Sequence, residues 1–298
     1  MKKQFVSIAI IGKYMDPNAL QQMQHELAQL VQHLSQKDIQ VWVEENTAHH
    51  ASLVGVNTTT LSEIGTQVDL VVVMGGDGTM LSVARSLYEN QLPKPVPLVG
   101  INRGRLGFLT DLRTEDMLVE IDKILAGDFQ AESRMLLEAS VCRAGVQVLK
   151  GVALNDVVIK SALRLMEMEV EINGQFVSKQ RADGLILSSP TGTTAYALSA
   201  GGPILHPDLN AISLVPISPH TLSNRPITVT SESVCEVTVM QADDAQLSLD
   251  GQYQQTLNMG DHVRVVRAKQ DILLLHPKGY CYFDMLRNKL NWGWCCDE

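Results

Sequence analysis

The sequence of 298 residues has few cysteines and few aromatic residues, and it lacks any long apolar run. Its five cysteines are scattered, without the spacing of a zinc site or of a disulfide framework. No apolar stretch approaches the ~20 residues of a membrane-spanning helix. The apolar start at residues 5–11 is short and is followed by no small-residue cleavage site. We therefore expect a cytoplasmic protein without a membrane partner, in which residues 5–11 form a first buried strand.

Positive charge is scarce as well. The chain has 24 Lys and Arg against 33 Asp and Glu, which gives a formal net charge of −9. Proteins that bind a nucleic-acid backbone need patches of Lys and Arg, so we expect no nucleic-acid partner. This total still permits a locally basic pocket for a small phosphorylated molecule.

Several common catalytic motifs are missing. The sequence has no P-loop, no G-x-G-x-x-G fingerprint, no G-x-S-x-G elbow and no H-E-x-x-H helix. The His49-His50 pair is interpreted as solvated residues of a loop. Three histidines next to prolines are interpreted as turn residues: His206, His220 and His276. Trp292 and Trp294 are interpreted as packing residues.

The segment from Val68 to Met80, VDLVVVMGGDGTM, is the most informative one. Its β-branched run is typical of a strand buried on both faces, and a helical pattern with Leu81 and Ala84 on one face follows. Glycines between a strand and a helix allow a phosphate to approach backbone N–H groups. Asp77 is then either an acid/base group or metal contact beside a phosphate, or a cap of the following helix. The loop alone does not separate these alternatives.

The first part of the chain alternates strand and helix patterns, which predicts a doubly wound α/β domain over residues 1–134. Strands are expected at residues 5–11, 39–43, 70–74 and 97–101. An amphipathic helix is expected around residues 20–34. A second helix, with Leu118, Ile121 and Leu125 inward, is expected to be capped by residues 114–116 and to end at Gly127.

From Met135 onward the apolar period becomes two. Residues 166–172 alternate apolar residues with glutamates and lead into Asn173-Gly174, which is typical of a hairpin with a type I′ turn. We expect residues 135–268 to form a mainly antiparallel, sandwich-like β domain. The tail, residues 269–298, reverts to a strand and a helix with a stripe of Phe283, Leu286 and Leu290, and we expect it to return to the first domain.

Residues 181–207, RADGLILSSPTGTTAYALSAGGPILHP, are a second candidate site. Small residues allow a ligand to approach the backbone, and hydroxyl groups can bond sugar or phosphate oxygens. Arg181 and Asp183 add charge, and Tyr196 offers a ring that can lie against a base. A turn-rich surface loop is the alternative, but the density of Gly, Ser and Thr beside a strand end favours ligand binding.

GGDG at 75–78, the Asn155-Asp156 pair and the block from Asp183 to Pro207 together resemble the NAD kinase family, bacterial type. Further matches are INRGRLGFL at 101–109, SPHTLSNRP at 218–226, LDGQ at 249–252 and the tail from 276 to 292. The resemblance implies transfer of the γ-phosphoryl of ATP to the 2′-hydroxyl of the adenine ribose of NAD, giving NADP. It also implies a homodimer or homotetramer, and Mg²⁺ or another divalent cation brought with ATP.

The same resemblance implies roles for individual residues. Asp77 is the base that orients or deprotonates the hydroxyl, and Gly76 and Gly78 leave room for phosphates. Asn155 and Asp156 hydrogen-bond the dinucleotide, and Arg181 is associated with preference for NAD over NADH. The other expected contacts to the dinucleotide are Arg164, Asp183, Thr191, Thr194, Ala195, Tyr196, Ala197, Leu198, Ser199 and Gln252.

Two other functions compete with this one. A kinase for a lipid or a sugar with a similar GGDG loop explains Asp77 but leaves residues 181–207 unexplained. A non-catalytic sensor of NAD(P) explains that block, but a pure binding loop gains nothing from a carboxylate beside phosphate.

Overall fold

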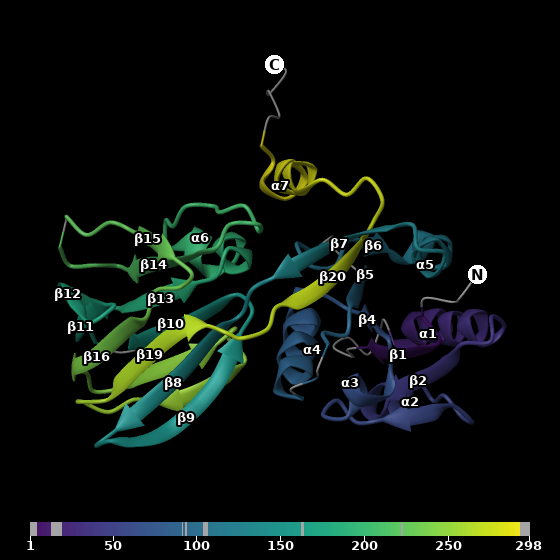
Figure 1. The fold of residues 1–298 in the computed structure, drawn as a ribbon, viewed down its shortest axis with the longest axis horizontal. Helices are drawn as coiled ribbons and strands as arrows, with labels where there is room; N and C mark the ends of the chain where they lie inside the picture. The colour runs from purple at the N-terminus through teal and green to yellow at the C-terminus, as the bar shows by residue number, and fades with distance from the viewer. Residues whose placement is uncertain are drawn as a thin grey trace. The chain divides into compact units, whose positions relative to one another are not determined.

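The computed structural model describes residues 5–12, 20–90, 92, 94–103, 107–161, 164–221 and 223–292 (Figure 1). The chain divides into two compact units, of which the first comprises Met1–Ser133 with Ile272–Glu298 and the second comprises Arg134–Asp271. None of the described helices is long and apolar enough to cross a membrane.

The first unit is built on a sheet of eight described strands, in the order β3-β2-β1-β4-β5-β20-β7 with β6 beside β5. The pairings that join β1 to β2 and β4, and β5 to β4 and β20, are parallel. The strands are β1 (Ser7–Gly12), β2 (Gln40–Glu44), β3 (Asn57–Thr59), β4 (Leu70–Met74), β5 (Leu98–Asn102), β6 (Leu112–Arg113), β7 (Phe129–Arg134) and β20 (Ile272–Pro277). This architecture confirms the expected doubly wound α/β domain.

Apolar patterning explains these elements. Every residue of β4 is fully buried, as a strand in a parallel sheet covered on both faces requires. Met23, Leu27 and Leu34 form the buried face of the first helix. The helices of this unit are α1 (Leu20–Ser35), α2 (Glu45–His50), α3 (Ile64–Gln67), α4 (Asp77–Glu89), α5 (Met117–Leu125) and α7 (Tyr282–Leu290).

Four local expectations were wrong. The pair His49-His50 lies in the last turn of α2 and not in a loop, and both side chains are exposed. Residues Thr114–Asp116 form a 3₁₀ turn before α5 and give that helix no side-chain cap. In α7 the buried face is formed by Tyr282, Met285 and Leu286, whereas Phe283 is 57% exposed.

The fourth error concerns His276, which is a buried residue of strand β20 and not a turn residue. A histidine beside a proline is typical of a turn, but here Pro277 ends the strand. Of the two tryptophans, Trp292 is half-exposed, and Trp294 lies outside the described residues.

The tail returns to the first unit as expected. Strand β20 lies between β5 and β7, as the yellow arrow among the teal and blue strands in Figure 1 shows. Ile272, Leu274 and Leu275 on this strand are nearly inaccessible to solvent. The last strand in the sequence is thus an interior strand of the first sheet.

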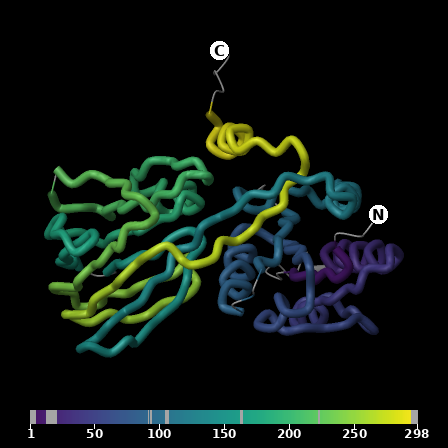
Figure 2. Tube along the Cα trace, viewed as in Figure 1, coloured from purple at the N-terminus to yellow at the C-terminus, as the bar shows by residue number. Residues whose placement is uncertain are grey.

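The second unit contains two antiparallel sheets of six described strands each, which confirms the expected sandwich-like domain. Their orders are β15-β14-β13-β10-β17-β18 and β12-β11-β16-β19-β8-β9. Figure 2 shows how segments far apart in sequence, such as the teal β8 and the yellow β19, lie side by side. The strands are β8 (Leu137–Arg143), β9 (Val146–Ala153), β10 (Asp156–Ser161), β11 (Met166–Ile172), β12 (Gln175–Ala182), β13 (Gly184–Ser188), β14 (Ala211–Ile217), β15 (Ile227–Thr230), β16 (Cys235–Gln241), β17 (Ala245–Leu249), β18 (Tyr253–Thr256) and β19 (His262–Arg267).

Alternating residues of both sheets form one core. Met166, Met168 and Val170 of β11 are buried with Leu185 and Leu187 of β13. The hairpin β11–β12 turns at Asn173 (φ 53°) and Gly174 (φ 71°), as expected for a type I′ turn. This core holds β10 and β17, which carry the residues of the site described below.

Candidate functional site

The GGDG loop occupies the position at which a doubly wound sheet binds ligands. It follows β4, whose neighbours are β1 and β5, and the sequence order of the strands reverses direction between β1 and β4. Ligands of such sheets bind at the carboxyl ends of the strands on either side of that reversal. The helix α4 begins at Asp77, two residues earlier than the sequence pattern indicates.

The carboxylate of Asp77 is held by a second loop and does not cap α4. Its Oδ2 accepts a hydrogen bond from the N–H of Phe108 at 2.8 Å. Its Oδ1 accepts one from the N–H of Leu109 at 3.1 Å and one from the hydroxyl of Thr110 at 3.3 Å. The N-cap residue of α4 is Gly76, which has no side-chain cap. The capping alternative for Asp77 is therefore wrong.

The loop of residues 107–110 is shaped to receive this carboxylate. A Cβ atom at Gly107 would overlap Oδ1 of Asp77, so this position is restricted to glycine while Asp77 keeps its place. The side chain of Asn102, at the end of β5, donates to the hydroxyl of Thr110 at 2.9 Å and orients it. A carboxylate offers about four acceptor sites. Described residues use three of them, which leaves about one for a ligand.

The described residues contain no group of three or more His, Cys, Asp or Glu that could hold a metal ion. Asp77 is thus a single, well-held carboxylate beside a glycine loop and the N-terminus of a helix. Such a loop can place N–H groups against phosphate, and such a carboxylate can accept a hydrogen bond from a hydroxyl group.

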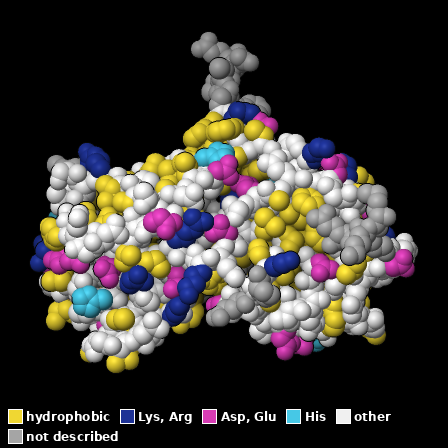
Figure 3. Space-filling model, in the orientation of Figure 1, with side chains coloured by type: hydrophobic (Ala, Val, Ile, Leu, Met, Phe, Trp, Pro, Cys, Tyr) yellow, Lys and Arg dark blue, Asp and Glu magenta, His cyan; other side chains and the backbone are white. Residues whose placement is uncertain are grey.

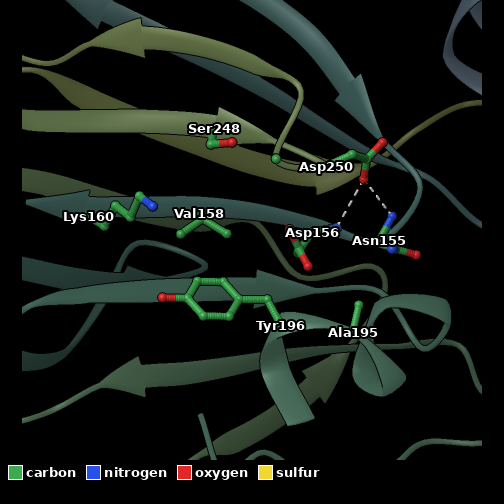
Figure 4. A pocket seen from close by; sticks show the side chains of 9 residues that line it. Asn155, Asp156, Val158, Lys160, Ala195, Tyr196, Ser248 and Asp250 are labelled. Atoms are coloured by element: carbon green, nitrogen blue, oxygen red, sulfur yellow. Dashed lines mark hydrogen bonds between the residues drawn. The ribbon is translucent and has the colours of Figure 1, made fainter. Parts of the chain in front are cut away.

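The second unit has a pocket of about 220 Å³ in its β10–β17 region (Figure 4). Figure 4 shows Asn155 and Asp156 beside Asp250 on one side, and Ala195 and Tyr196 on the other. The lining residues are Asn155, Asp156, Val158, Lys160, Ala195, Tyr196, Ser248, Asp250 and Gly251. The structure thus brings together the Asn-Asp pair and part of the 181–207 block, which lie about forty residues apart in sequence.

Asp250 fixes the Asn-Asp pair, although the sequence pattern assigned it no role of its own. Its carboxylate accepts hydrogen bonds from the N–H groups of Leu154 (3.1 Å), Asn155 (2.8 Å) and Asp156 (3.3 Å). Its own φ of 51° turns the chain between β17 and β18. The LDGQ match at 249–252 is the one signal in the sequence that points to it.

The carboxyl group of Asp156 faces the pocket from a nearly inaccessible position, since the residue is only 4% exposed. Burial, together with the charge of Asp250, raises the pKa of Asp156 to about 7. Near neutral pH the group can therefore donate or accept a hydrogen bond, according to its protonation.

Most hydroxyl groups of the 181–207 block hold the loop itself. The hydroxyls of Thr193 and Thr194 donate to the carbonyls of Pro190 and Thr191, and Ser189 bonds Leu154. The hydroxyl of Thr191 accepts from the buried Arg134 at 3.2 Å. These bonds shape the 3₁₀ turn η3 (Thr191–Thr194) and the short helix α6 (Tyr196–Ser199), which carry Ala195 and Tyr196 to the pocket.

Gly192 joins this loop to the Asn-Asp pair. A Cβ atom there would overlap the carbonyl of Asn155, so only glycine allows the close approach. Ser189 donates its N–H to that same carbonyl at 2.9 Å.

Several expected contact residues do not line the pocket. Arg164 is exposed and pairs with Asp243 at 3.0 Å. Arg181 is also exposed, with its Nε 3.8 Å from Oε1 of Glu167 on the neighbouring strand. Ala197, a residue of α6, is buried with Val158, Ile186 and Val215. The remaining residues outside the lining are Asp183 between β12 and β13, Thr191, Thr194, Leu198, Ser199 and Gln252.

Comparison with known proteins gives a consistent result. Residues 8–129 match the family model of the ATP-NAD kinase N-terminal domain, and residues 154–276 match that of the C-terminal domain. An NAD kinase of Thiobacillus denitrificans is 47% identical over 98% of this chain and 99% of its own length. An NAD kinase of Nitrosomonas europaea is 46% identical over 97% of this chain and 96% of its own length.

Solved structures show the same fold. Yeast NADH kinase complexed with NADH superposes with a TM-score of 0.86 at 25% identity, over 99% of this chain and 90% of that one. An NAD kinase from Archaeoglobus fulgidus in complex with ATP superposes with a TM-score of 0.72 at 23% identity, over 95% of this chain and 98% of that one. The chain therefore belongs to the NAD kinase family, whose reaction is the ATP-dependent phosphorylation of NAD to NADP.

Proposed function

We propose that Asp77 orients the 2′-hydroxyl of the adenine ribose of NAD for attack on the γ-phosphorus of ATP. The observation that carries this proposal is the fixed carboxylate, with three bonds from residues 108–110 and about one acceptor site left over. The O2′–Pγ bond forms, the bond from Pγ to the β,γ-bridging oxygen breaks, and the hydroxyl proton passes to Asp77. Because phosphoryl transfer usually has a loose transition state, positioning matters more than early removal of the proton.

The glycines before and after Asp77 serve the phosphates of ATP in this proposal. Gly76 is exposed, and an added Cβ would meet no protein atom within 4 Å. The protein itself therefore does not require glycine at this position, whereas an approaching phosphate does. Gly76 and Gly78 lie at the N-terminus of the 13-residue helix α4, which favours negative charge.

Magnesium, or another divalent cation, belongs to the substrate in this proposal. Among the described residues, the carboxylate of Asp77 has about one acceptor site left for a ligand, and no cluster of metal ligands is present. Mg²⁺ usually keeps several waters and is bound through phosphates with one or two carboxylates. Bound to ATP, it would offset the repulsion between the phosphates and Asp77.

The pocket of the second unit is assigned to the dinucleotide. The ring of Tyr196 is 41% exposed and borders the pocket, where it is placed to lie against a base. Asn155 and Asp156 are placed to hydrogen-bond sugar hydroxyls. Thr191 and Thr194 support this arrangement through their hydrogen bonds, and Ala197 supports it through its burial. Leu198 and Ser199 are the remaining residues of α6 assigned to the dinucleotide.

Four polar residues expected to contact NAD stand outside the pocket and are assigned to the parts of NAD that extend beyond it. They are Arg164, Arg181, Asp183 and Gln252. Arg164 and Arg181 lie on exposed surface, where their cations remain accessible to a ligand. The preference for NAD over NADH is assigned to Arg181.

We further propose that the protein is a homodimer or homotetramer. Apolar side chains are exposed on both edge strands of one sheet of the second unit, at Val146 (64%) on β9 and Phe176 (62%) on β12. Exposed apolar edge strands are prone to pair with another chain. Sedimentation velocity at micromolar protein measures this directly, and a monomer at all concentrations contradicts it.

The cytoplasm is the proposed location of the reaction. Cys142, Cys235 and Cys281 are unpaired, as is usual in a reducing compartment. Fractionation of cells that express the protein tests this location.

The face shown in Figure 3 carries Lys and Arg interspersed with Asp and Glu, so it offers no broad basic surface among its described residues.

One assay tests the reaction and the role of Asp77 together. The purified protein is incubated with NAD, ATP and Mg²⁺, and NADP is detected with an NADP-specific dehydrogenase. We expect the wild type to form NADP and Asp77→Asn to lose roughly 10²–10⁴-fold in turnover while it still binds NAD. A variant that keeps full activity would exclude the proposed role of Asp77.

A further inference from the structure

The tail brings a buried cluster of ionisable groups to the loop that holds Asp77. His276 on β20 places its Nδ1 2.9 Å from Oδ2 of Asp111 and its Nε2 3.0 Å from Oε2 of Glu132. All three side chains are at most 9% exposed. The ring of Tyr280 stacks on the imidazole at 4.0 Å with an angle of 11° between the planes. No step of the reaction described above uses this cluster.

The surroundings of the imidazole favour its charged form. A neutral imidazole has only one N–H, whereas here both ring nitrogens face carboxylates. Burial by itself lowers the pKa of His276, but the bonds and charges of Asp111 and Glu132 outweigh it and raise that pKa. These two carboxylates are the charged groups that act on the ring among the described residues.

Asp111 depends on His276. Its Oδ2 receives the bond from Nδ1, and its buried Oδ1 has no hydrogen-bond partner in the part of the chain that the structure describes. The imidazolium is therefore the hydrogen-bond partner of this carboxylate among the described residues. A buried carboxylate without a partner is costly, so loss of the imidazolium would drive Asp111 toward water.

Asp111 directly follows the three residues that hold Asp77. Phe108, Leu109 and Thr110 donate to Asp77, and the N–H of Gly107 donates to the carbonyl of Thr110 at 3.2 Å. A shift of Asp111 would thus move the donors of Asp77. The tail also reaches this loop at a second point, because Lys289 of α7 lies 5.9 Å from the ring centroid of Phe108.

We propose that His276 is a positioning residue for Asp77, acting through Asp111 and the loop of residues 107–111. This proposal rests on the proposed role of Asp77 in phosphoryl transfer. It gives the C-terminal strand a function in catalysis as well as in folding. Oε2 of Glu132 lies 3.0 Å from Nε2 of the same imidazole, but Glu132 belongs to β7 and therefore has no such connection to the loop.

That difference provides a matched control. The variants His276→Gln, Asp111→Asn and Glu132→Gln each remove one member of the cluster. We expect the first two to lower kcat about tenfold, since small displacements of a positioned group cost rate, with the KM for NAD little changed. Glu132→Gln should keep kcat within about twofold, and the double variant of 276 and 111 should be no slower than the slower single variant. Equal loss of kcat in all three variants would show a merely structural role and overturn the proposal.

Amide hydrogen exchange separates this proposal from the role of Asp77. We expect the N–H groups of Phe108 and Leu109 to exchange faster in His276→Gln and in Asp111→Asn than in the wild type and in Glu132→Gln. Unchanged exchange overturns the proposal even if Asp77→Asn is inactive. Faster exchange with an active Asp77→Asn would instead refute the role of Asp77. If neither the 276 nor the 111 variant folds, His276 serves the fold alone and the proposal is wrong.

Discussion

Gly107 lies against the carboxylate of Asp77, with no space between them for a Cβ atom. The two residues are thirty positions apart, one at the start of α4 and the other in the loop after β5. The loop therefore needs glycine at position 107, because any side chain there would displace the carboxylate of Asp77.

Gly107→Ala should displace Asp77 and lower kcat by about tenfold or more, because the added methyl group occupies the place of a carboxylate oxygen. Steady-state kinetics with ATP and NAD measure this loss. Gly76→Ala is the matched control, since its Cβ meets no protein atom. It should fold with unchanged stability and raise the KM for ATP. A Gly107→Ala enzyme with wild-type kcat would contradict the seating of Asp77 described here.

Asp156→Asn should change how stability depends on pH. Burial and the charge of Asp250 raise the pKa of Asp156 to about 7 in the folded protein, from an ordinary value of 3.8. The folded protein thus holds more protons than the unfolded chain between pH ~4 and ~7, so this group lowers the free energy of unfolding as pH rises through that window. Above pH ~7 this group lowers the free energy of unfolding by its full amount, at most ~4 kcal/mol.

Urea unfolding at pH 5 and pH 8 without ligands measures this effect. Asp156→Asn should be more stable relative to the wild type at pH 8 than at pH 5. Asp243→Asn, at an exposed carboxylate of the same unit, serves as the control. An identical pH dependence in the wild type and in Asp156→Asn would show that burial does not perturb this group.

A chain that ends at residue 270 should lose much of the stability of the first unit. It lacks β20, whose Ile272, Leu274 and Leu275 are buried. Burial of such side chains contributes roughly 1.5–3 kcal/mol each. Thermal unfolding monitored by circular dichroism measures the change. A chain that ends at residue 280 keeps β20 and lacks residues 281–298, which include α7, so it should melt closer to the wild type. If the first unit melts unchanged without β20, the inserted strand does not stabilise it.

Arg181→Gln should alter the choice between NAD and NADH. The guanidinium is exposed and only loosely paired with Glu167, at 3.8 Å, so its charge remains available to a ligand. We expect the wild type to prefer NAD and the variant to show a smaller ratio of kcat/KM for NAD over NADH. Glu167→Gln removes the partner and controls for the surface charge. Equal kcat/KM for both dinucleotides in the wild type would refute the preference.

Sequence by itself determined the local elements and the family. The buried strand before GGDG, the alternation in residues 166–172 and the Asn-Gly hairpin follow from propensities and periods that act over a few residues, and the structure shows all of them. Short elements such as α2 and β3 have too few residues to produce a period, and they were missed. The ordered motifs from GGDG to LDGQ were sufficient to indicate an NAD kinase.

Only the tertiary structure decided how the polar groups of the site are held. The donors to Asp77 come from residues 108–110, the acceptor that fixes Asn155 comes from Asp250, and His276 meets Asp111 across 165 positions of sequence. No local pattern encodes these pairs, because a buried polar group needs a partner but imposes no sequence distance on it. The proline beside His276 is typical of a turn, whereas the returning strand buries this histidine between two carboxylates.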